Sequence, residues 1–351
     1  MPSWLTHQGP DSDVVISTSI GLARNCAHHR FPVHASADER TATFSEVLTA
    51  FSRSGLRDSF NFVNFNNLDK TQQQFMVEER CATRDLTAAK GDRGVMHDGS
   101  RRISIMVNGK DHIMMRCIDA GCRPNDLWTE VDGIDDAVGM QLEYAFDERR
   151  GFLTSHPADA GTGLRVSFLM HMPGLALTRG IGPVLDRASR TGLVATGFFD
   201  ERLSAAAGCI YLLSNSAAMG KGESEFCDRA YIAARRIIDH ERKARESILA
   251  DARSELADSI GSNFGVLCNS ALLQMEEFLN LSSVLRLGIE CTLFDKCTIQ
   301  DLNRLTLFAL PAHLQTFLNK DLDDGEIPRA RAGLVKSFFA HGTKKEGIVT
   351  L

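Results

Sequence analysis

Apolar and polar residues alternate along the first hundred residues in a way that predicts strands and a helix. Residues 14–20 (Val-Val-Ile-Ser-Thr-Ser-Ile) have the character of a buried strand, and residues 39–51 carry apolar side chains at helical spacing. Residues 72–82 and 103–108 alternate apolar and polar side chains and are predicted strands. The stretch 90–102 between them is rich in Gly, Asp and Arg, so we expect a flexible loop there that can cover a cleft.

The same alternation of elements continues through residue 214. The pattern predicts helices over 126–148 and 173–191, and strands over 165–170, 193–199 and 208–214. A Gly-rich passage, 154–165, lies between the first helix and the strand at 165. It is either a tight turn or a loop whose backbone amides approach a ligand, and we favour the turn. Strands interspersed with helices indicate an α+β fold with a mixed sheet that carries helices.

From residue 224 onward the pattern is helical only. Residues 224–257 form one long amphipathic pattern, followed by 272–293, by 299–317 with Pro311 inside it, by a polar break at 321–325 and by a last helix around 330–340. We therefore place a domain boundary near residue 255, which gives a first domain at 1–255 and a small all-helical domain at 256–351.

Composition and charge narrow the class of protein. The net charge of −6 provides no basic field for nucleic acid or an acidic membrane surface. No apolar run has the length of a membrane helix, so we expect a cytoplasmic protein. The nine cysteines show no C-x-x-C pair and no zinc-site spacing, and we expect reduced thiols that pack as small apolar groups and bind no metal.

Several motifs, in order along the chain, resemble one family. They include Gly9-Pro-Asp-Ser-Asp-Val-Val-Ile-Ser17, Val107-Asn-x-x-Asp-His112, Gly161-Thr-Gly-Leu-Arg165 and Leu285-Arg-Leu-Gly-Ile289. Further matches lie at 22–25, 30–32, 144–148, 151–155, 213–215 and 241–245. Together they resemble the bacterial protein-arginine kinases of the McsB type, members of the ATP:guanido phosphotransferase (phosphagen kinase) family. The resemblance implies a guanidino-kinase domain with a largely antiparallel sheet flanked by helices, followed by a helical, dimerisation-type domain.

The family's reaction explains which residues ought to matter. A guanidinium attacks the γ-phosphoryl group of Mg-ATP, yet with a pKa above about 12 it is cationic and a poor nucleophile. The resemblance therefore implies two carboxylates that orient and deprotonate it, and a cage of arginines around the phosphates.

Most positions of the arginine cage hold no cation in this chain. The family's S-S-R-x-R segment corresponds to Ser17-Thr-Ser19-Ile-Gly21, its D-H-I-R arginine to Met114, and the arginine before its G-x-Y-G-E segment to Thr196. Only Arg165 is retained. Arg116 and Lys110 are candidate relocated cations that would bind a phosphate without transfer.

The carboxylates have been replaced as well. Lys110 occupies the expected general-base position, and the second glutamate corresponds to Ala205, with Glu201 as a conceivable substitute. His156 replaces the family's substrate-side cysteine. It is either a base or ligand of a remodelled pocket or, as we favour, a loop residue that fills vacated space. Removing a single preorganised charge-stabilising donor costs about 3 kcal/mol, so losses on this scale predict little turnover.

The C-terminal region departs from the family in a similar way. The family's R-D-x-x-R-A motif, which reads phosphoarginine, begins here with Ile327 and Pro328, and only Arg331-Ala332 remains. The arginine and aspartate that open the motif are therefore absent, which argues against phosphoarginine sensing through this motif.

The sequence thus favours a pseudokinase that acts as a regulatory or binding module. We expect it to pair through its C-terminal helices with itself, with another protein or with an active paralogue, and ATP and Mg binding is an open expectation. One alternative is an active protein-arginine kinase with a rebuilt site, which uses Glu201 or Asp111 as base and Arg165, Arg116 and Lys110 as clamp. The other is a reader of arginine-rich or phosphoarginine-bearing proteins that uses the emptied cleft.

Overall fold

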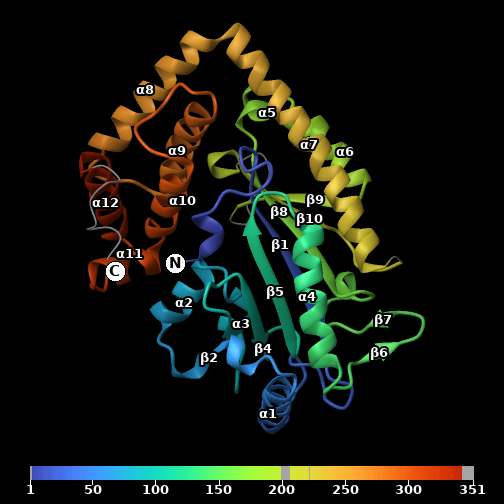
Figure 1. Cartoon of the computed structure of the whole chain (residues 1–351). Helices are drawn as coiled ribbons and strands as arrows, with labels where there is room; N and C mark the ends of the chain where they lie inside the picture. Colours follow the sequence, from blue (N-terminus) through green and yellow to red (C-terminus); the bar gives the residue numbers. More distant parts are fainter. Residues whose placement is uncertain (1, 199–205, 221, 342–351) are drawn as a thin grey trace.

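An eight-stranded sheet forms the centre of the chain. A computed structural model describes residues 2–198, 206–220 and 222–341 (Figure 1). The strands are β1 (Val15–Arg24), β2 (Asn61–Asn64), β3 (Gly94–His97), β4 (Ile103–Val107), β5 (Ile113–Ala120), β8 (Leu164–His171), β9 (Leu193–Gly197) and β10 (Ile210–Asn215). Their order is β2-β3-β4-β5-β1-β8-β10-β9, and every neighbouring pair among them is antiparallel. The short strands β6 (Phe146–Asp147) and β7 (Gly151–Phe152) form a separate ribbon.

Four helices cover one face of this sheet. They are α1 (Ala37–Arg53), α4 (Pro124–Gly139), α6 (Ile181–Arg190) and α7 (Glu223–Asp251). Side chains that point to this side, such as Ile20, Cys117 and Val166, join one large apolar core with these helices. Because side chains alternate along a strand, the neighbouring residues Ser19, Arg116 and Arg165 point to the opposite face.

The opposite face is partly covered by the C-terminal helices and by the N-terminal segment. The helices are α8 (Arg253–Asn269), α9 (Met275–Glu290), α10 (Ile299–Phe308), α11 (Pro311–Leu318) and α12 (Ile327–His341). Trp4 and Leu5 join Ile118 and Leu169 of the sheet in one core with these helices. Figure 1 shows the helical region in orange and red beside the N-terminus, reached over the long arm formed by α7 and α8.

Three short helices complete the fold: α2 (Lys70–Glu78), α3 (Arg84–Ala88) and α5 (Pro173–Leu177). None of the helices in the described ranges combines the length and apolar character that a membrane crossing requires. The nine cysteines carry free thiols, and all but Cys209 and Cys268 are buried.

The largely antiparallel sheet flanked by helices and the helical C-terminal region confirm the expected fold class, but several predicted elements were wrong. The strand predicted at 72–82 is helix α2, which begins at a capping box in which the Asp69 side chain and the Gln72 amide each bond to the other's backbone N–H. The loop predicted at 90–102 contains β3, which pairs with β2 and β4.

Long helical predictions were also too long. The helix predicted at 126–148 ends at Gly139, and the chain beyond it forms the β6-β7 ribbon. The helix predicted at 173–191 is divided into α5 and α6, and the one at 224–257 is divided at Ala252, whose φ of −142° and ψ of 35° leave the helical region. Apolar residues at helical spacing predict the buried side of a helix but do not reveal such breaks, because the same spacing continues after each break.

Candidate functional site

A pocket of about 450 Å³ opens on the sheet face that carries the polar residues. Its floor is built by strand register. On β1, Gly21 lies opposite Arg116 of β5 on one side and opposite Arg165 of β8 on the other. In the next layer of the sheet, Ser19 lies opposite Ser167. Gly21, which has no side chain, therefore has one arginine on each side, Arg116 on β5 and Arg165 on β8.

The retained Arg165 is held by a carboxylate. Its guanidinium donates a hydrogen bond from Nη2 to Oδ1 of Asp159, which lies in the Gly-rich passage. Lys110 Nζ lies 3.5 Å from Asp159 Oδ2, and His156 Nδ1 lies 4.0 Å from the same oxygen. Asp159 is buried, whereas Arg165 and His156 are about half exposed. One buried carboxylate thus faces three basic side chains at the rim of the pocket.

Asp159 was not among the residues singled out from the sequence. Its role depends on groups from positions 110, 156 and 165, which only the fold brings together. The one available signal was its place in the Gly-rich passage, where an acidic residue is unexpected in a loop that would approach phosphates.

Arg116 is the second arginine of the pocket. Its Nη1 donates a hydrogen bond of 3.2 Å to the carbonyl oxygen of Arg80, which also lines the pocket. Burial lowers the pKa of the Arg116 guanidinium. Among the described residues no carboxylate lies within ion-pair distance of it. Arg116 therefore brings a positive charge to the pocket that a bound anion can neutralise.

The other positions of the expected cage are occupied by neutral side chains. Ser19 and Thr196 line the pocket, and Ser17 is buried in β1. Met114 lies beside Gly21: a Cβ built on Gly21 would be 3.8 Å from the Met114 sulfur. Glu201 and Ala205 lie outside the described residues.

Asp111, the other candidate base, is engaged in holding two loops together. It is buried, and its Oδ1 accepts hydrogen bonds of 2.7 Å from Asn25 Nδ2 and from the backbone N–H of Ser155. The Ser155 hydroxyl donates a hydrogen bond of 2.7 Å to the Lys110 carbonyl oxygen. These bonds fix the positions of Lys110 and His156 relative to β1.

The residual phosphoarginine motif plays a structural part. The guanidinium of Arg331 is buried and donates to the carbonyl oxygens of Ala309 and Leu273, each at 2.8 Å. It therefore ties α12 to the segments that end α10 and precede α9. Ile327 and Pro328 begin α12.

Comparisons with known proteins agree with this architecture. The model of the ATP:guanido phosphotransferase C-terminal catalytic domain matches residues 43–244, and the model of the protein-arginine kinase McsB C-terminal domain matches residues 253–347. The protein-arginine kinase of Moorella thermoacetica is 33% identical over 340 residues, which are 96% of this chain and 97% of that protein. The protein-arginine kinase of Bacillus subtilis is 32% identical over 338 residues, with 96% and 93% covered.

Solved structures show the same fold. A lombricine kinase covers 68% of each chain with a TM-score of 0.56 and 21% identity. The duplicated taurocyamine kinase from Schistosoma mansoni, with bound transition-state analogue components, covers 76% of this chain and 38% of its own with a TM-score of 0.61 and 18% identity. With both domain models matched in order and full-length relatives a third identical, the chain belongs to the protein-arginine kinases of the ATP:guanido phosphotransferase family.

Proposed function

We propose that this protein keeps the protein-arginine kinase fold but no longer transfers phosphate to arginine, and that it acts as a regulatory module that binds other proteins. The observation that carries this proposal is the arrangement around Asp159. The buried carboxylate pairs with Arg165, the one arginine of the expected cage that remains, and lies close to Lys110 at the expected general-base position. An ammonium group there repels a substrate guanidinium and accepts no proton from it.

The remaining candidate base in the described part of the chain also supports loss of transfer. Asp111 already accepts two short hydrogen bonds from Asn25 and Ser155 and is 1% exposed. Both bonds are to Oδ1, and Oδ2 has no hydrogen-bond partner among the described residues, but it is buried, so a substrate guanidinium would reach it only if the loops around Asp111 moved apart. In a binding module, by contrast, such a residue preserves the shape of the cleft.

Phosphate binding without transfer is supported by a separate observation. Arg116 and Arg165 lie on the two strands that flank Gly21, so one guanidinium group stands on each side of the pocket floor. These groups fit the phosphate chain of a nucleotide, and Mg-ATP bound there would supply the phosphoryl group that the family transfers. We propose that the pocket holds a nucleotide or another polyphosphate as a ligand of the module.

The C-terminal helices are the proposed surface for protein partners. Val266 on α8 and Leu272 just after it expose apolar side chains, with 43% and 57% of their surfaces accessible. They are the exposed apolar side chains that a partner at this place could cover. We propose that the chain pairs here with a second copy or with an active paralogue. Sedimentation at micromolar concentration should show dimers, and a pure monomer would argue against self-association.

Incubation with radiolabelled ATP tests the proposal directly. The protein is incubated alone, with arginine-rich protein substrate, and with an authentic protein-arginine kinase, and acid-labile phosphate is scored. We expect no labelling by this chain alone and altered labelling when the authentic kinase is present. Labelling by this chain alone that disappears in Arg165→Ala would show instead an active kinase with a rebuilt site.

A further inference from the structure

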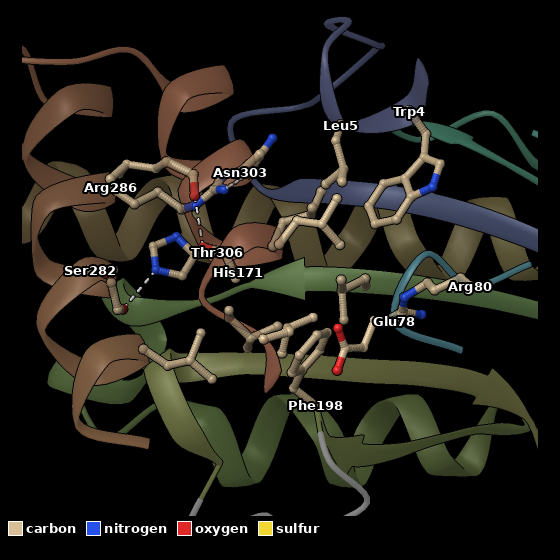
Figure 2. Close-up of a pocket in the computed structure, with 18 residues that line it drawn as sticks. Trp4, Leu5, Glu78, Arg80, His171, Phe198, Ser282, Arg286, Asn303 and Thr306 are labelled. Atoms are coloured by element: carbon tan, nitrogen blue, oxygen red, sulfur yellow. Dashed lines mark hydrogen bonds between the residues drawn. The ribbon is translucent and has the colours of Figure 1, made fainter. Parts of the chain in front are cut away.

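A second cavity lies between the sheet and the C-terminal helices, and Arg80 lines both this cavity and the pocket described above. It measures about 60 Å³ and is lined by residues of β1, β8 and β10 on one side and of α9 and α10 on the other (Figure 2). Most of its wall is apolar, with Leu169 and Ile210 from the sheet and Leu279 and Leu302 from the helices. Polar side chains lie at both ends of the cavity, with Glu78 and Arg80 at one end and a larger group around Arg286 at the other (Figure 2).

Arg286 on α9 brings a buried positive charge to that end. Its side chain is 7% exposed, and its Nη2 donates to Oδ1 of Asn303. Among the described residues no carboxylate lies within 4.0 Å of its guanidinium. Burial lowers the pKa of Arg286 to about 10, although the Glu290 carboxylate one turn further along α9 acts to raise it. A buried guanidinium without a counterion is costly, so this group favours a bound anion.

Several buried polar atoms beside Arg286 have no partner within the described residues. They are Oγ of Ser282, Nδ1 of His171 and, further along the cavity, Nε1 of Trp4. The other ring nitrogen of His171, Nε2, lies 2.8 Å from the Ser283 hydroxyl. Burial first, and then the charges of Arg286 and Arg245, lower the pKa of His171, so the ring is neutral. Buried polar atoms normally have a partner, and here one is lacking where a ligand atom would lie.

The remaining charged groups near the cavity do not neutralise Arg286. Glu78 lies at the far end of the cavity (Figure 2), where it accepts hydrogen bonds from the backbone N–H groups of Ala312 and His313. Arg245 donates to the carboxylate of Glu241 and to the carbonyl oxygen of His171. The Arg286 end therefore carries a positive charge that Glu290 offsets only from beyond 4.0 Å among the described residues, and this charge matches a ligand with one negative charge.

We propose that this cavity binds a small monocarboxylate, such as acetate or propionate. Its carboxylate bonds to the Arg286 guanidinium and the Ser282 hydroxyl, and its alkyl part lies between Leu279 and Leu302. A planar guanidinium matches a carboxylate with two parallel hydrogen bonds. The size agrees, because an apolar cavity of about 150 Å³ holds benzene and this smaller one suits a shorter molecule.

Such a ligand would connect the two parts of the chain. It would contact α9 and α10 together with β8, so it binds only when the helical region is seated on the sheet. A compound that binds the folded form alone raises the midpoint of thermal unfolding in a saturable way. Binding of the carboxylate would thereby stabilise the contact between the C-terminal helices and the sheet, whether or not the protein transfers phosphate.

Thermal unfolding and calorimetric titration with sodium acetate and sodium propionate test the proposal, with sodium chloride at equal ionic strength as reference. We expect saturable binding and a higher unfolding midpoint with the carboxylates only. Ser282→Ala should weaken carboxylate binding about tenfold, because it removes one hydrogen bond to a charged group. The ligand-free variant should be as stable as the parent or more so, since the hydroxyl that it removes has no partner in the described structure.

Ser247→Ala, at an exposed position on α7, is the matched control and should bind like the parent protein. Arg286→Gln should abolish binding, and if that variant does not fold, Ser282→Ala still decides the question. Equal stabilisation by chloride and carboxylates, no saturable heat, or unchanged affinity of Ser282→Ala would each overturn the proposal and leave a cavity that holds water only.

Discussion

The Glu78 carboxylate on α2 lies 2.7 Å from Nδ1 of His313 on α11 and accepts the backbone N–H groups of Ala312 and His313 at 2.9 and 3.0 Å. A residue from the sheet-bearing part of the chain therefore caps a helix of the C-terminal region. The first N–H groups of a helix have no partner within it, and a carboxylate there also interacts favourably with the helix dipole. Phe75, three residues before Glu78, stacks on the same imidazole at 4.0 Å.

Glu78→Ala should lower the free energy of unfolding by about 2 kcal/mol, because it leaves the N–H groups of α11 and the buried imidazole without their acceptor. Urea unfolding followed by circular dichroism measures this loss. Glu148→Ala, at an exposed position, is the control and should change stability by less than about 0.5 kcal/mol. A Glu78 variant as stable as this control would show that the cap does not hold the helical region in place.

Asp159→Asn should strengthen the binding of ATP or tripolyphosphate. The substitution removes the negative charge that faces Lys110, His156 and Arg165. Repulsion between such a carboxylate and a nearby phosphate costs roughly 1 kcal/mol of binding free energy, or about fivefold in affinity. Fluorescence titration with a labelled nucleotide measures the change. Asp126→Asn, an exposed change on α4, should have no effect. If Asp159→Asn leaves the affinity unaltered, Arg165 does not contact phosphate.

Gly21→Arg should restore one cation to the pocket without disturbing the strand. A Cβ at this position would meet no atom closer than 3.8 Å, and the backbone of Gly21 has no positive φ. We expect tripolyphosphate affinity to rise about tenfold, which is the value of one added charge-assisted hydrogen bond. Gly21→Gln adds a shorter polar side chain without the charge and is the control. Equal affinities of the two variants would place the phosphates away from β1.

His112 should make stability depend on pH between about 4 and 6.5. Burial lowers its pKa from 6.5 to about 4; its Nδ1 accepts the N–H of Cys26, and its Nε2 lies 3.0 Å from the Arg30 carbonyl oxygen. As the pH falls below 6.5, His112 becomes protonated in the unfolded chain but stays neutral in the folded chain. The free energy of unfolding therefore falls until His112 is protonated in both states, near pH 4. The loss over this window is about 3 kcal/mol.

Urea unfolding at a series of pH values measures this dependence. His112→Gln should reduce the slope of the curve between pH 4 and 6.5 and leave the part that buried His171 contributes, whereas His28→Gln, at an exposed position, should leave the curve unchanged. A wild-type curve that is already flat would mean that His112 is protonated in the folded protein.

The motifs were enough to predict the family and the sheet-plus-helices fold, because they mark the turns and strand ends that the fold requires. Local patterns were less reliable for single elements. The apolar-polar alternation at 72–82 favoured a strand, yet the reciprocal bonds of Asp69 and Gln72 begin a helix at that place. Likewise a single residue, Ala252, divides what the apolar stripe presents as one helix.

The candidate site could be predicted in its residue types but not in its pairings. Arg116, Arg165, His156 and the neutral cage positions Ser19 and Thr196 do line one pocket. That Arg116 and Arg165 lie on either side of Gly21 depends on the register of three strands that are far apart in sequence. The role of Asp159 depends on a loop conformation that no local pattern encodes.

Because the chain turns from α7 into α8 at Ala252, the number of residues in α7 determines where α8 and the helices after it lie. Each residue in a helix advances the chain by about 1.5 Å and turns it by about 100°. One residue inserted into α7 would therefore swing α8 and everything after it to another side of the arm, out of reach of Trp4 and Leu169. A chain of this kind tolerates substitutions along the exposed side of the arm far better than any change in its number of residues.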